Sequence, residues 1–121
     1  MNKEQALHAF WASFGIPAYD ENTVPTDATL PRLTYSVATD SFGSSVPLSA
    51  SLWYRTTSWE DITLKSNEIE ADIGRGGKLV AYEGGAIWIK RGVPFAQRVS
   101  DENDAIRRIY LNVEAEYISA D

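Results

Sequence analysis

The chain has 121 residues and no cysteine, so it has the length of one domain, and disulfide bonds and cysteine-ligated zinc are excluded. Its formal net charge of -6 argues against sequence-specific recognition of DNA or RNA, because phosphate backbones are bound by basic surfaces. Neither a membrane-spanning apolar run nor an apolar signal core is present, and we expect a single domain over residues 1–121, made in the cytoplasm, not exported by the standard route and without membrane contact.

An amphipathic helix is predicted over Lys3–Phe14, followed by Gly15, which favours helix termination. Its apolar stripe has the spacing of a helix and comprises Leu7, Phe10, Trp11 and Phe14. His8 flanks this stripe and is the only histidine, and no partner for a metal site or a catalytic triad stands at a suitable spacing. We therefore expect His8 to be half-buried in a structural position.

A polar segment with two prolines, Asp20–Pro31, is predicted to be an exposed loop. Loops of this length in compact domains are often functional, and we expect this one to become ordered against a partner. Apolar residues then alternate over residues 33–37 and 46–54, which predicts two strands joined by a turn at 41–44. Pro47 indicates an edge position or a bulge in the second strand.

A second amphipathic helix is predicted over Trp59–Ile73. Its apolar stripe comprises Trp59, Ile62, Ser66, Ile69 and Ile73. Ser58, followed three residues later by Asp61, resembles a capping box at the start of this helix. The glycines of Gly74–Gly77 tolerate positive φ and are expected to end it.

The strongest hairpin signal pairs residues 78–82 with 86–90 across Glu83–Gly85, and Gly92–Pro94 is expected to break the second of these strands. After a polar loop at 101–104, a long strand over Ile109–Tyr117 has one apolar and one polar face. The resulting order is α-β-β-α-β-β-β. It predicts an α+β fold, in which an antiparallel sheet of about five strands has two helices packed on one face.

Three patterns resemble a phosphate loop, a calcium loop and an acid–base pair of carboxylates. Each is better explained as a helix cap, a turn or a solvated surface. Gly74–Lys78 resembles a phosphate loop, but it follows a helix and enters a strand, which is the reverse of the order that such loops need. The segment that starts at Asp101 lacks the glycine and the glutamate of a calcium loop, so a capped turn is expected. The carboxylates on or beside the polar face of the second helix are Glu60, Asp61, Glu68, Glu70 and Asp72. We therefore expect no catalytic residue, no metal, no cofactor and no enzymatic activity.

The tryptophans leave alternatives open. Trp59 lies on the apolar stripe of the second helix and is expected in the core. Trp53 stands beside Arg55 in a strand, where an exposed interface anchor, a core position and a ligand platform are all compatible with the pattern. Trp53 and Trp88 together also fit a carbohydrate-stacking platform.

Several segments stand in one order along the chain. They are 30–35 (LPRLTY), 52–59 (LWYRTTSW), Lys65 with Glu68-Ile69, 84–97 (GGAIWIKRGVPFAQ), 106–112 (IRRIYLN) and 116–117 (EY). In this order they resemble the conserved body of the small tail-terminator, or tail-completion, minor tail proteins of long-tailed bacteriophages. The resemblance spans Leu30–Tyr117.

The resemblance implies an α+β fold and a homohexameric ring at the head-proximal end of the tail tube. Such a ring ends tube polymerisation and joins the tail to the head, so the implied partners are further copies of the chain, the tail tube protein and the head–tail connector protein. Genomic DNA would pass through the lumen without specific binding, which suits an acidic wall that repels phosphate. The implied location is the virion, and the host cytoplasm during assembly.

Ring closure needs two different patches that meet, and arginine and aromatic residues are favoured at such contacts. The interface candidates flank strand ends and the expected break at Pro94; they are Trp53, Arg55, Arg91, Phe95, Gln97 and Arg98. Two other functions remain open: a head–tail connector or adaptor (neck) protein, which would contact the connector and not the tube, and a small carbohydrate-binding module.

Overall fold

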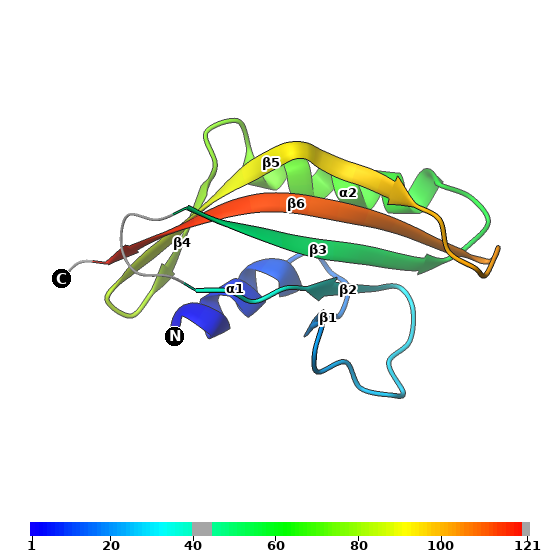
Figure 1. Ribbon diagram of the computed structural model, residues 1–121, viewed down its shortest axis with the longest axis horizontal. Helices are drawn as coiled ribbons and strands as arrows, with labels where there is room; N and C mark the ends of the chain where they lie inside the picture. Colours follow the sequence, from blue (N-terminus) through cyan, green and yellow to red (C-terminus); the bar gives the residue numbers. More distant parts are fainter. Residues whose placement is uncertain (40–44, 120–121) are drawn as a thin grey trace.

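The computed structural model describes residues 1–39 and 45–119, which form two helices and one six-stranded sheet (Figure 1). The elements are α1 (Lys3–Ala12), β1 (Ala18–Asp20), β2 (Arg32–Tyr35), β3 (Ser45–Arg55), α2 (Glu60–Ile73), β4 (Lys78–Tyr82), β5 (Gly85–Val99) and β6 (Ile106–Ser119). The strand order across the sheet is β1-β2-β3-β6-β5-β4, and its pairings are antiparallel apart from β1 with β2. The α+β class is as predicted, whereas the sheet has six strands instead of about five.

The additional strand is β1, which ends at Asp20, the residue where the exposed loop was expected to begin. Its three residues are too few for an alternating pattern to be visible in the sequence. Tyr19 pairs in parallel with Thr34, and the Leu33 amide donates a 2.8 Å hydrogen bond to the Pro17 carbonyl. The rest of the predicted loop, residues 21–31, contains turns and no helix or strand.

The predicted pairing of β2 with β3 is confirmed, although the expected turn at 41–44 lies outside the described residues. β6 pairs with the whole length of β3 on one side, whereas β2 pairs only with Ala50–Trp53 on the other, so Pro47 has the edge position expected of it. Pro47 lies beyond the part of β3 that β2 reaches. The amide and carbonyl of Ser49 both point toward Ser36, and Pro47, two residues earlier, faces the same side without a partner strand. The missing N–H of Pro47 therefore costs no ladder hydrogen bond.

The hairpin of β4 and β5 is confirmed, but the expected strand break at Gly92–Pro94 is wrong. β5 continues to Val99, and its register against β6 shifts between Arg91 and Ala96. The Asn112 side chain donates a 3.1 Å hydrogen bond to the Pro94 carbonyl and holds this bulge. A bulge lets a strand carry extra unpaired residues without ending, and so the proline interrupts the ladder without terminating the strand.

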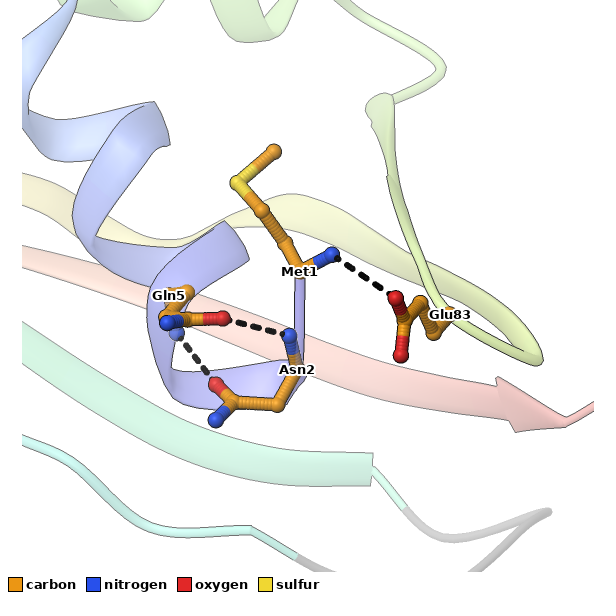
Figure 2. Close-up of polar contacts among 4 residues, drawn as sticks. All are labelled: Met1, Asn2, Gln5 and Glu83. Atoms are coloured by element: carbon orange, nitrogen blue, oxygen red, sulfur yellow. Dashed lines mark hydrogen bonds and ion pairs between the residues drawn. The ribbon is translucent and has the colours of Figure 1, made fainter.

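Helix α1 begins with a reciprocal cap that Figure 2 shows. The Gln5 amide donates to Asn2 Oδ1 at 2.8 Å, and the Asn2 amide donates to Gln5 Oε1 at 2.9 Å. The amino group of Met1 lies 3.8 Å from Glu83 Oε1, which connects the start of α1 to the turn between β4 and β5. The helix ends at Ala12, two residues earlier than predicted, and Gly15 has a positive φ of 83°.

Helix α2 buries Ile62, Ser66, Ile69 and Ile73, as its spacing predicts, and leads into the positive-φ residues Gly74 and Gly77. Its predicted capping box is wrong. The N-cap is Trp59, which makes no side-chain capping bond, and the Ser58 hydroxyl accepts from the Glu60 amide at 3.1 Å. A capping box needs the serine itself at the N-cap, so the one-residue offset removes it.

Both helices contribute to one core with alternate residues of the long strands. The strand residues that are buried in this core include Leu48, Ala50, Leu52, Ile87, Ile89, Ile109, Leu111, Val113, Ala115 and Tyr117. In Figure 1, α2 lies behind β5 and β6. The residues that alternate with the core positions form the other side of the sheet, which we call the open face.

Candidate interface surfaces

The described residues offer no metal site, because no group of three or more histidines or acids is arranged to hold an ion among them. His8 is exposed, not half-buried as expected, and its Nδ1 lies 2.9 Å from the Tyr35 hydroxyl. The loop at Asp101 is the expected capped turn, in which its Oδ1 accepts from the Asn103 amide. Neither described helix has the length and apolar character to cross a membrane.

The carboxylates of α2 lie on a solvated surface, as expected, and three of them form ion pairs. Glu68 pairs with Lys65 at 3.0 Å, Asp72 with Lys78 at 2.7 Å. Glu70 pairs at 3.5 Å with Arg91, one of the predicted interface residues. No two carboxylates of α2 are buried together, so the burial that acid–base catalysis by paired carboxylates requires is absent from this helix.

Five of the seven arginines gather at one end of the sheet, where β2 and β6 begin and β3 and β5 end (Figure 1, right). The register against β6 places them within a few residues of one another; they are Arg32, Arg55, Arg98, Arg107 and Arg108. We call this region the arginine end. Within residues 1–39 and 45–119, none of these five side chains forms an ion pair.

Trp53 is held between two of these arginines on the open face. The guanidinium carbon of Arg108 lies 4.4 Å from its ring centre, and that of Arg32 lies 5.9 Å away. The indole N–H donates a 3.0 Å hydrogen bond to the Thr34 hydroxyl. The Arg108 Nε and Nη2 both donate to the Ser51 hydroxyl, at 3.1 and 3.0 Å. Stacking and hydrogen bonds therefore fix the Arg108 guanidinium in one orientation before any partner binds.

An open hollow of about 380 Å³ lies beside this stack, between Trp53, Arg55 and the segment Ala28–Leu30. Arg32 also lines it; its Nη1 donates to the Ala28 carbonyl at 3.2 Å, and its Nε is buried without a hydrogen-bond partner. Arg55 is exposed. The hollow thus combines an aromatic wall with cationic N–H donors, which is the chemistry that recognises a carboxylate.

A second tryptophan is flanked by arginines on the helix side of the same end. Trp59 has Arg98 at 4.6 Å and Arg107 at 5.3 Å from its ring centre. The expectation that Trp59 belongs to the core is right in part, because it is partly buried against the core cluster. Arg107 also donates to the carbonyls of Thr57 and Asp104, at 2.9 Å each, and so ties the start of β6 to neighbouring loops.

The predicted interface residues do not form one patch. Trp53 and Arg55 lie at the hollow just described, and Arg98 lies beside Trp59. Arg91 and Phe95 line a different hollow of about 570 Å³ at the bulge of β5. Phe95 is only 8% exposed and belongs to the core, and it has the same odd-numbered parity along β5 as the buried Ile87 and Ile89. Gln97 is exposed and lies opposite Tyr110 in the ladder.

Sequence reasoning missed Arg32, Arg108 and Tyr110 on the open face. Arg108 and Tyr110 alternate with the core residues of β6. This alternation predicts that both lie on the open face, but it does not predict which residues they contact. The contact of Arg108 with Trp53 depends on the pairing of β3 with β6, which joins positions far apart in the chain. No local sequence signal reports that pairing.

The other end of the open face carries acids. Glu114 and Glu116 follow on β6, opposite Lys90 and Trp88 of β5. The Lys90 ammonium lies over the Trp88 ring at 4.5 Å, and neither glutamate forms an ion pair within residues 1–39 and 45–119. Trp53 and Trp88 pair with positions eight residues apart on β6, roughly 27 Å along the strand, so they do not form a shared stacking platform.

No protein-family model matches the chain, and no curated protein is similar to it in sequence. A chain in a solved structure titled "Virion of native gene transfer agent (GTA) particle" is similar in fold, with a TM-score of 0.58. The two chains are 21% identical, and the match covers 94% of this chain and 90% of that chain. The fold of this protein is therefore shared, over nearly its full length, with that chain.

Proposed function

We propose that this chain is a structural virion protein that acts as a tail terminator. Six copies would form a ring at the head-proximal end of a tail tube, end its polymerisation and join the tail to the head. The observation that carries the proposal is the nearly full-length similarity in fold to a chain from a gene transfer agent particle. The order of sequence segments that resembles phage tail-terminator proteins supports the same role.

The surface chemistry is compatible with an assembling subunit. Tryptophan and arginine are enriched where proteins meet, and two tryptophans here stand between arginines at one end of the sheet. A ring needs two different patches on each copy. The arginine end and the hollow at the β5 bulge are separate surfaces of that kind.

Charge supports a lumen that DNA traverses without adhering. The net charge of -6 opposes retention of a phosphate backbone. The proposed partners are accordingly further copies of the chain, the tail tube protein and the head–tail connector protein, with DNA as a passing polymer.

The test adds the purified chain to polymerising tail tube protein and measures tube length and end density by negative-stain electron microscopy. A terminator stops growth and leaves a cap at one end of each tube, whereas an acidic domain of similar size leaves the length unchanged. Tubes that grow undecorated at saturating concentrations of the chain contradict the proposal. Binding to the connector without tube contact would replace it by the role of a head–tail connector.

A further inference from the structure

The open face carries opposite charges at its two ends. Arg55 and Arg108 lie at the arginine end, and Glu114 and Glu116 lie toward the other end of β6. Arg108 and Glu114 are six residues apart on one strand, which is roughly 20 Å. At that separation the arginines cannot pair with the glutamates within one copy. Lys90 lies opposite Glu114 on β5, but its ammonium stacks on the Trp88 ring and forms no ion pair with either glutamate among the described residues.

The two ends are also available for contact. Arg55 and Glu114 are exposed, and no ion pair of either is found in the part of the chain that the structure describes. Arg108 uses its Nε and Nη2 on Ser51, which leaves Nη1 free to donate to an incoming carboxylate. Because Trp53 already orders this guanidinium, binding loses little side-chain entropy.

We infer that the arginine end of the open face docks against Glu114 and Glu116 of a second copy of this chain. The inference rests on the proposed ring and names one of its contacts. Each copy would present its arginines to one neighbour and its glutamates to the other, which is the heterologous type of contact that the proposed ring needs. The charge distribution of a single copy supplies both halves of this contact.

A second copy fits this surface better than a nucleic acid does. Asp101, Glu102 and Asp104 lie in the loop between β5 and β6, at the same end as the arginines. Their charges repel a polyanion that extends past the arginines. Two neighbouring carboxylates of a second copy can contact the open face without reaching this acidic loop. Complementary charges on two proteins give the contact its register and its specificity.

The first experiment uses the absence of native cysteine. In the double variant Arg55→Cys/Glu114→Cys, the two positions lie about eight strand residues apart within one copy, roughly 27 Å, so a disulfide can form only between copies. We expect a ladder of linked multimers under mild oxidation, on denaturing gels. The control Arg55→Cys/Glu21→Cys moves one cysteine to an exposed loop position and should give far less ladder. Equal ladders from both, or no ladder, overturn the inference.

The second experiment reverses charges. Arg55→Glu alone and Glu114→Lys alone should each weaken self-association about tenfold, measured by sedimentation velocity and by occupancy of tail-tube ends. An equimolar mixture of the two variants should restore it, because every contact in an alternating ring then joins opposite charges. Glu21→Lys changes the net charge as Glu114→Lys does and should have no effect. A mixture that stays as weak as the single variants overturns the inference.

The outcomes separate this inference from the proposed function. If the wild-type chain caps tail tubes and the charge reversals change nothing, the contact is wrong and the terminator role stands. If copies cross-link as expected and no tube is capped, the contact stands and the terminator role fails. Retention of duplex DNA by the wild type that Arg55→Glu abolishes would assign the arginine end to nucleic acid and overturn docking of a second copy.

Discussion

At the scale of single residues, burial separates side chains of the same type. Leu52 is fully buried in β3, between Leu33 on β2 and Ile109 on β6. Leu64 lies on α2 and is 60% exposed. The same leucine side chain therefore contributes to stability in one place and is nearly neutral in the other.

Replacement of these two leucines by alanine tests that difference. Leu52→Ala should lower the free energy of unfolding by about 2–5 kcal/mol, because it removes buried methyl groups and leaves a cavity in the sheet. Leu64→Ala should change it by less than about 0.5 kcal/mol. Urea unfolding followed by tryptophan fluorescence measures both. Equal losses of stability would contradict the burial of Leu52 or the exposure of Leu64.

Two buried tyrosines and one partly buried tyrosine make stability depend on alkaline pH. Burial raises the pKa of Tyr35, Tyr54 and Tyr117 above the ordinary value of 10.0, and neighbouring acids add to the effect at all three. An unfolded tyrosine loses its proton near 10.0 while the folded one keeps it, so the unfolded state binds fewer protons in that range. The free energy of unfolding should be unaffected below 10.0 and fall as pH rises through the folded pKa.

Tyr117→Phe isolates one of these groups. Tyr117 is 1% exposed, and its hydroxyl donates a 2.8 Å hydrogen bond to the Ala38 carbonyl. At neutral pH the variant should be less stable by about 1 kcal/mol, from the lost hydrogen bond. Above pH 10 its stability should fall less steeply than that of the wild type, by up to about 1.4 kcal/mol per pH unit. Identical alkaline slopes would contradict the assignment.

At the scale of elements, the hairpin of β4 and β5 depends on close backbone approach at Gly85. This residue pairs with Ser119 of β6, and a Cβ built on it would collide with the Ile118 carbonyl oxygen. The Tyr82 hydroxyl donates to the same carbonyl at 3.1 Å. A side chain at position 85 must therefore displace the strand end from β6 or break this bond.

Gly85→Ala should accordingly lower the free energy of unfolding by about 1–3 kcal/mol and expose the end of β6 to amide hydrogen exchange. Gly76→Ala is the matched control, since a Cβ there meets nothing within 4 Å and the residue has no positive φ. The control should stay within about 0.5 kcal/mol of the wild type. A neutral Gly85→Ala would show that β4 and β5 do not close against β6 as described.

At the scale of the whole molecule, charge is distributed unevenly in an acidic chain. The net charge is -6, yet five arginines stand at one end of the sheet and Glu114 and Glu116 lie farther along the open face. Opposite charges that lie apart within one copy favour contact between copies, and that attraction is screened by salt.

Self-association should therefore weaken as NaCl rises from about 0.05 to 0.5 M, by roughly tenfold in the association constant. Sedimentation velocity at fixed protein concentration measures the change. Association that strengthens with salt would instead indicate an apolar contact. Val93, which is 99% exposed at the bulge of β5, would then be the first residue to substitute.

Local sequence patterns were sufficient to predict most of the helices and strands. The helical spacing of Leu7, Phe10 and Trp11 and the alternation of Ile109, Leu111 and Val113 report directly which face is buried, because helix and strand periodicities differ. Strand β1 was not predicted, because three residues are too few to show a strand periodicity. The bulge at Pro94 was predicted as a strand break, because a proline within a strand pattern usually indicates one.

The sequence by itself determined the class of the fold, its two helices and the absence of cysteine chemistry, since these depend on composition and on neighbours within a few residues. Only the tertiary structure decided which side chains meet. Trp53 lies between Arg32 and Arg108 because β2, β3 and β6 pair side by side. Arg98 lies beside Trp59 on the helix side because the bulge of β5 places it opposite Ile109, a core position of β6. Strand pairing joins residues tens of positions apart, and the surface available to a partner follows from that pairing.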